Sequence, residues 1–157
     1  MMDKKKLEMF IGAILDPHGF RKKAGTWYRQ GGDSLHVFNL QKSSYGNQYY
    51  INLCLVPVGI DVEGYPTPKE HKCPIRARLG ALTTEDEKAH IARLLDLEDG
   101  TISDLEKETE IEKILNVKVL SFFDKIESTG LKKAASQGLL EKFLVTLTAK
   151  KYLCMAE

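Results

Sequence analysis

The N-terminal residues place their hydrophobic side chains at the spacing of an amphipathic helix. Leu7, Phe10, Ile11, Ile14 and Leu15 recur every three or four positions, so they share one apolar face. The Asp16–Pro17 step predicts the end of this helix, because a residue that precedes proline is pushed out of the helical region.

Three stretches rich in aromatic and β-branched residues follow. They cover 26–30 (TWYRQ), 35–42 (LHVFNLQK) and 48–57 (QYYINLCLVP), and the turns GGD and YGN separate them. Short glycine-containing turns between such stretches predict a three-stranded antiparallel meander. After a long loop with three prolines, CPIRARLGAL alternates apolar and arginine side chains and predicts a fourth strand.

The alternation within these strands predicts two different sheet faces. Tyr49, Ile51, Leu53 and Leu55 share one side of the third strand, and we expect Ile51 and Leu53 to face the helices. Phe38 and Leu40 of the second strand belong to the same core side. The opposite face then collects the polar and cationic side chains of three strands: Asn39, Gln41, Asn52, Arg76 and Arg78.

The rest of the chain is predicted to be mainly helical. Thr84 with Glu87, and Ser103 with Glu106, have the form of capping boxes that open helices. The second of these helices is expected to run from Asp104 to about Ile126, and two shorter helical pieces follow, split around Gly138. The prediction is a single α+β domain, 1–157, with an N-terminal helix, an antiparallel β-meander of three to four strands and a helical C-terminal third.

Composition narrows the class of protein. With 157 residues and 43% hydrophobic content, the chain can bury one core. Its formal net charge is only +1, although residues 96–112 hold eight acidic side chains and one lysine. Three cysteines without a C-x-x-C pair argue against a disulfide framework, and no apolar run is long enough to cross a membrane. We therefore expect a reduced, cytoplasmic protein.

Two stretches of the chain resemble a known family. They are GFRKKAGTWYRQGGDSLHVFNLQKSSYGNQYYINL (19–53) and EHKCPIRARLGAL (70–82), and the NLQKS run after a tryptophan is the most specific part. They are similar to the bacterial family known as domain of unknown function 4304. The resemblance implies a small bacterial α+β protein, and the family brings no established activity, cofactor or catalytic residue.

The polar sheet face has two interpretations. An antiparallel sheet can leave one face in water, so these side chains could form an ordinary wetted surface. Alternatively, the face recognises a partner: amides and guanidinium groups would supply directional hydrogen bonds, and Trp27 or Tyr50 would supply contact area. The candidate binding residues under this second interpretation are Trp27, Asn39, Gln41, Tyr50, Asn52, Arg76 and Arg78.

No motif in the sequence indicates catalysis, a cofactor or a metal site. His71 and Cys73 form half of a metal motif, and only Cys54 or His36 could join them, whereas zinc needs three or four ligands. The sequence contains no phosphate-binding glycine loop, no H-E-x-x-H and no G-x-S-x-G. The near-neutral charge and the lack of a basic aromatic motif argue against a nucleic-acid partner.

Two functional hypotheses follow. The first is a non-enzymatic bacterial protein that binds another protein, such as a toxin that it neutralises. The second is a small enzyme that holds an anionic substrate with Arg76 and Arg78 on the open sheet face. A large toxin gene beside this one would favour the first hypothesis, and a pocket that encloses both arginines would favour the second.

Overall fold

The computed structural model describes residues 1–156 and begins with the predicted amphipathic helix. Helix α1 covers Lys4–Leu15, and Asp3 caps it by accepting a hydrogen bond from the Lys6 backbone at 2.8 Å. The chain leaves the helix through a 3-10 turn, η1, at Asp16–His18. Gly19 follows with φ of 88°, a left-handed conformation that favours glycine.

The sheet has six antiparallel strands, ordered in space as they are in the chain. They are β1 (Arg21–Lys23), β2 (Thr26–Gln30), β3 (Ser34–Lys42), β4 (Tyr49–Pro57), β5 (Ile75–Arg78) and β6 (Leu144–Val145). The predicted antiparallel meander is confirmed as β2–β4, and the fourth strand as β5. The predicted count of three to four was too low, because the two edge strands β1 and β6 are only three and two residues long.

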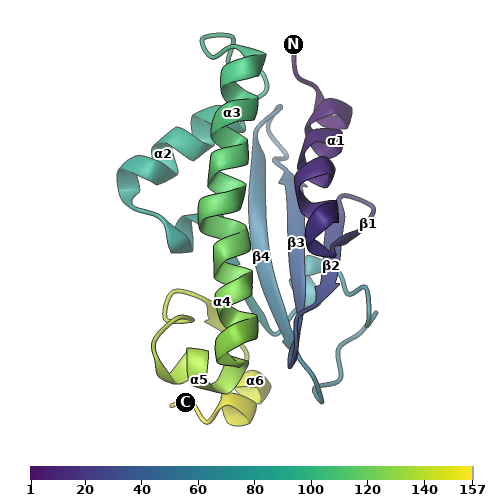
Figure 1. Ribbon diagram of the computed structural model, residues 1–157, viewed down its shortest axis with the longest axis vertical. Helices are drawn as coiled ribbons and strands as arrows, with labels where there is room; N and C mark the ends of the chain where they lie inside the picture. The colour runs from purple at the N-terminus through teal and green to yellow at the C-terminus, as the bar shows by residue number, and fades with distance from the viewer. Residues whose placement is uncertain (157) are drawn as a thin grey trace.

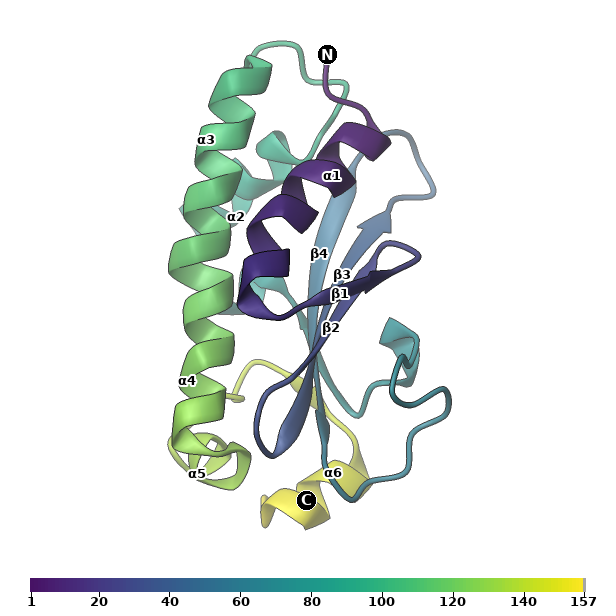
Figure 2. The same cartoon turned by 45° about the vertical axis from the view of Figure 1, so that its right-hand side comes forward.

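The main core lies between one face of this sheet and the helices. Ile51 and Leu53 are buried there together with Phe38 and Leu40, which confirms the predicted core face. Helix α1 and a long helical stretch lie across this face (Figures 1 and 2). The stretch consists of α3 (Asp104–Ile114), a π-helical segment η4 (Leu115–Leu120) and α4 (Ser121–Thr129). It begins at Ser103, whose hydroxyl accepts from the Glu106 backbone, so the predicted capping box is formed in this one bond only.

Shorter elements complete the structure. Helix α2 (Glu85–Leu94) begins at the predicted capping box, in which Thr84 and Glu87 exchange both hydrogen bonds. The 3-10 turns η2 (Glu70–Lys72) and η3 (Leu79–Leu82) flank β5. The two predicted C-terminal pieces are α5 (Leu131–Ser136) and α6 (Leu147–Leu153). No helix within residues 1–156 has the length and apolar character to cross a membrane.

The second face of the sheet is only partly open. The loop 58–74 folds back along it (Figure 2) and covers an apolar cluster of Tyr28, Leu35, Val37, Cys54, Val56 and Cys73. The buried Tyr28 hydroxyl donates to the Pro68 carbonyl at 2.8 Å and ties the loop to β2. The face that the sequence predicts to be polar is therefore half apolar and covered, and half polar.

Candidate binding site

The uncovered half of this face carries a row of polar side chains that crosses four strands. Thr26 pairs with Asn39, Asn39 with Asn52, and Asn52 with Arg78 in the strand register. Residues directly opposite each other in an antiparallel sheet share a face, so these side chains stand next to one another. The predicted gathering of Asn39, Gln41, Asn52, Arg76 and Arg78 is thus confirmed.

Asn52 organises this row from below the surface. Its side chain is buried, and its amide nitrogen donates to Asn39 Oδ1 and to Gln41 Oε1, both at 2.9 Å. Asn39 in turn donates to the Thr26 hydroxyl at 2.9 Å. Both amide hydrogens of Asn52 are used inside the protein, so it orients its neighbours. This corrects the expectation that Asn52 itself contacts a partner.

The two arginines add unpaired charge to the same face. The Arg78 guanidinium lies 3.9 Å from the centre of the half-buried Tyr50 ring, a cation–π contact that holds its position. Neither Arg78 nor the half-buried Arg76 makes an ion pair or a side-chain hydrogen bond within residues 1–156. Both guanidinium groups therefore keep their donors free.

Trp27 is wrongly predicted as a contact residue. It pairs with Phe38 across β2 and β3, so it lies on the core face, where it is fully buried. Its ring meets Phe38 edge-on, with the ring centres 5.6 Å apart. Gly12 of α1 comes close to the indole, so this tryptophan packs the N-terminal helix onto the sheet.

A groove of about 580 Å³ runs over part of the polar row. Thr26, Asn39 and Gln41 form its floor, and Lys69, Glu70 and His71 of the loop form one bank. Tyr28 and Leu40 also line it, so the groove is a concave surface of mixed polar and apolar character that carries both positive and negative side chains. This shape suits an extended or protruding part of a partner.

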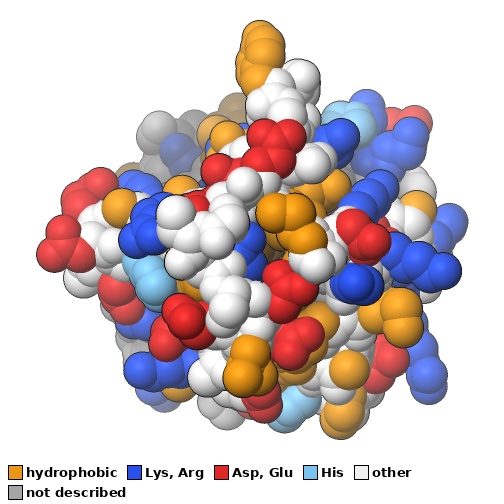
Figure 3. All heavy atoms as spheres, turned by 90° about the horizontal axis from the view of Figure 1, so that it is seen from above, with side chains coloured by type: hydrophobic (Ala, Val, Ile, Leu, Met, Phe, Trp, Pro, Cys, Tyr) orange, Lys and Arg blue, Asp and Glu red, His pale blue; other side chains and the backbone are white. Residues whose placement is uncertain are grey.

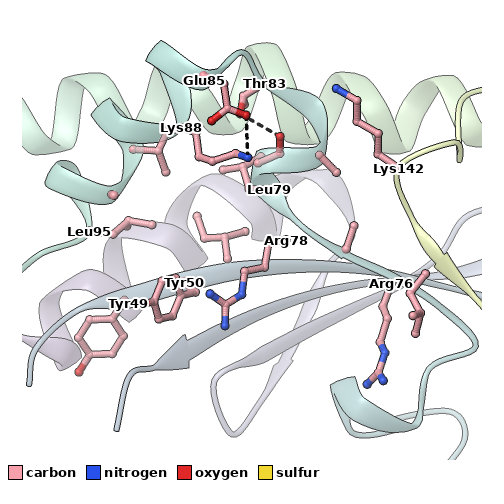
Figure 4. A pocket seen from close by; sticks show the side chains of 17 residues that line it. Tyr49, Tyr50, Arg76, Arg78, Leu79, Thr83, Glu85, Lys88, Leu95 and Lys142 are labelled. Atoms are coloured by element: carbon pink, nitrogen blue, oxygen red, sulfur yellow. Dashed lines mark hydrogen bonds and ion pairs between the residues drawn. The ribbon is translucent and has the colours of Figure 1, made fainter. Parts of the chain in front are cut away.

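A second cavity, of about 680 Å³, lies at the edge of the sheet between β4, β5, η3 and α2. Figure 4 shows Arg78 beside Tyr50 below α2, with Lys142 and Arg76 toward the other end. Lys88 of α2 also lines this cavity and pairs with Glu85 at 3.2 Å. Arg76 and Arg78 both line this cavity, although Arg78 is exposed. A pocket that encloses both arginines is the feature that would favour the second hypothesis, an enzyme with an anionic substrate.

Several residues that line the edge cavity were not predicted from the sequence. The capping box had placed the start of α2, and Lys88, Ile91, Ala92 and Leu95 follow at helical spacing on one side of it. That spacing could have marked them as one surface. Lys142 comes from a segment without regular structure before β6, and no local pattern places it at the edge of β5.

The thiols and histidines that could bind metal do not converge. Cys54 and Cys73 lie together in the second apolar cluster, and the contact with Cys73, then burial, raises the pKa of the Cys54 thiol. His71 is exposed on η2, and His36 lies on the core face against Phe123. Within residues 1–156, no three His, Cys, Asp or Glu side chains are arranged to hold a metal ion.

The fold and the site define an α+β protein with a partly covered antiparallel sheet and an arginine-bearing polar face. Residues 11–125, well over half of the chain, match the family model described as domain of unknown function (DUF4304), and the chain belongs to that family. The same comparisons found no matching curated protein and no matching solved structure. The predicted family is confirmed, and its name carries no activity.

Proposed function

We propose that the protein is a non-enzymatic binding protein that recognises an acidic surface on a partner protein through the polar sheet face. One observation carries the proposal: two guanidinium groups, Arg76 and Arg78, stand on this face without an acidic partner within residues 1–156. An arginine binds a carboxylate through two parallel hydrogen bonds, which gives both affinity and orientation.

The surroundings of the arginines support recognition. Arg78 is already stacked on Tyr50, and Asn39 and Gln41 are held by Asn52. Side chains that are fixed before binding lose less conformational entropy when the partner arrives. Arginine and tyrosine are also the residue types that most often dominate the binding energy of protein interfaces.

In its specific form, the proposal is that the partner is a toxin, and that this protein neutralises it in the cytoplasm of a bacterial cell. The support is a general one: small proteins without catalytic motifs often act by covering a partner's surface. The fold by itself does not decide between functions. An acidic surface patch on the toxin would complete the match in charge.

Affinity capture from the native host tests the proposal. We expect the wild-type chain to retain an acidic protein that the variant with Arg76→Ala and Arg78→Ala does not retain. Raising the salt concentration should weaken the wild-type complex, because exposed charge contacts are screened. A partner held equally by both chains would contradict the proposal, and a captured toxin whose lethality survives co-expression would contradict its specific form.

A second candidate function is an enzyme that uses the arginines to hold an anionic substrate. The edge cavity of about 680 Å³ favours it, since this volume is ordinary for small-molecule sites. The acid in its wall, Glu85, is paired with Lys88, and the wall offers no histidine or cysteine within the described residues. The cavity thus supports anion binding more directly than it supports turnover.

A further inference from the structure

The edge cavity exists because β6 covers only half of β5. Leu144 and Val145 pair with Arg76 and Ile75, so Ala77 and Arg78 have no strand on their outer side. Helix α2 and the segment before β6 close around this uncovered edge. The result is a hollow next to a free strand end, separate from the groove over Asn39 and Gln41.

Cationic side chains dominate the polar part of the cavity. Lys88 reaches across η3, where Gly80 leaves it room: a methyl group at Gly80 would lie 2.8 Å from the lysine Cε. Its charge is balanced by Glu85 at 3.2 Å. Arg78 and Lys142 have no acidic partner within residues 1–156, so the cavity carries a surplus of positive charge.

The remaining walls are apolar. Ile51, Leu79 and Leu95 are buried at the base, and Ile91 and Ala77 are half-buried above them. Tyr50 adds an aromatic side whose ring is already stacked against Arg78 (Figure 4). A ligand that fits this cavity must combine an anionic group with a compact apolar body, because either part alone leaves half of the lining unmatched.

We propose that the edge cavity binds a small organic anion, a phosphate or carboxylate with an apolar body, with its charge toward Arg78. The apolar body would lie against Ile91, Ala92 and Leu95. The inference names the ligand class of the second candidate function and rests on that candidate only for anion binding, because it requires no turnover. It shares Arg78 with the polar face but requires no partner recognition there.

Calorimetric titration with naphthyl phosphate and naphthoate tests the ligand class. We expect at least one of these anions to bind at least about tenfold more tightly than neutral naphthol, because charge-assisted hydrogen bonds to the arginine are lost in naphthol. Inorganic phosphate should bind more weakly than naphthyl phosphate, since it leaves the apolar wall unfilled. Equal affinity for naphthol or for inorganic phosphate, or no binding of either anion, would overturn the proposal.

Two variants test whether the anion binds in the cavity. Arg78→Ala should weaken binding of the tighter anion several-fold, and Ala92→Trp should abolish it by filling the space. Lys113→Ala, which removes an exposed lysine of α3, is the matched control and should leave affinity unchanged. Unchanged melting temperatures show that the variants are folded; anion binding that survives both cavity variants would place the ligand elsewhere and refute the proposal.

The same variants separate this inference from partner recognition. Gln41→Ala lies in the polar groove and outside the cavity, so it should weaken partner binding and leave naphthyl phosphate or naphthoate binding intact. Ala92→Trp should do the reverse. Binding of the anion that is lost in Ala92→Trp would sustain the cavity assignment whether or not the probe is converted.

Discussion

The pKa of His36 shows how strongly the protonation of one buried side chain can depend on its surroundings. It is fully buried, and its ring is stacked on Phe123 with the centres 4.9 Å apart. Nδ1 accepts hydrogen bonds from the Arg29 guanidinium at 3.1 and 3.3 Å, which leaves the proton on Nε2, where it has no partner in the described residues. Arg29 is itself paired with Asp124 at 3.2 Å. Burial, and then the Arg29 charge, lowers the pKa of His36 to about 3.

This histidine predicts a loss of stability in mild acid. Its unfolded pKa of about 6.5 lies above its folded pKa, so the unfolded chain binds the proton first as the pH falls below 6.5. The free energy of unfolding should therefore fall by about 2 kcal/mol between pH 7 and pH 5, which urea denaturation at both values would measure.

The variant His36→Gln provides the control for this pH dependence. It is expected to be less stable than the wild type at pH 7, yet nearly flat between pH 7 and pH 5. A wild-type stability that does not change over this range would contradict the assignment. A fall over this range does not come from the carboxylates with lowered pKa, such as Asp99 and Glu87, because they lose their contribution only at lower pH.

A second prediction at this scale concerns metal. His71 is exposed and Cys73 is buried beside Cys54, so no set of co-ligands surrounds them within residues 1–156. We expect the purified protein to hold no stoichiometric zinc by elemental analysis. One zinc per chain that disappears in Cys73→Ser would show that the thiol is a ligand after all.

Residue-scale predictions from the sequence succeeded where strand alternation decides the outcome. The side-chain period of two placed Ile51 and Asn52 on opposite faces, as the structure does. Alternation alone did not place Trp27, which lies opposite the core residue Phe38 in the structure. Register across a turn decides such a case, and the sequence does not state the register.

At the scale of elements, the caps were the most reliable signals. Thr84 and Ser103 both cap helices through their own hydroxyl groups, since these bonds depend only on residues within one turn. Strands β1 and β6 were missed for the opposite reason. β1 is three exposed cationic residues, and β6 is two residues that pair only because the C-terminal chain returns to β5.

The loop 58–74 is the element whose role could be least foreseen. Its prolines predicted a loop, but its contacts with the sheet depend on side chains far away in the chain. The Tyr28 hydroxyl bond to Pro68 is buried, whereas the Gln30 amide bond to Tyr65, at 2.7 Å, is exposed. The buried contact should therefore matter more.

A pair of variants tests this difference. Tyr28→Phe should lower the free energy of unfolding by about 1–2 kcal/mol, because it leaves a buried carbonyl without a donor. Gln30→Ala, which removes the exposed contact, should change it by less than about 0.5 kcal/mol. Denaturant titration of both proteins measures the two values, and similar losses in the two variants would contradict the view that Tyr28 fastens the loop.

At the scale of the whole molecule, charge is arranged unevenly although the net charge is only +1. Seen from the end that carries the N-terminus, Lys and Arg side chains form a group at one margin, while acidic side chains lie mainly elsewhere (Figure 3). Such an arrangement can steer an acidic partner toward a particular approach. The proposed function depends on two arginines of the sheet face, Arg76 and Arg78, within this uneven distribution of charge.

The central claim is that the polar sheet face is the surface that recognises a partner. The direct measurement is the affinity of the captured partner for the double variant Gln41→Ala with Arg76→Ala, made together with its melting temperature. Gln41 is exposed, so water can replace its oxygen at the Asn52 amide, which also keeps its bond to Asn39; the fold should therefore tolerate the change. We expect nearly unchanged melting and binding weakened by about 2 kcal/mol or more, roughly thirtyfold. Unchanged affinity, or a large drop in melting temperature, would contradict the claim.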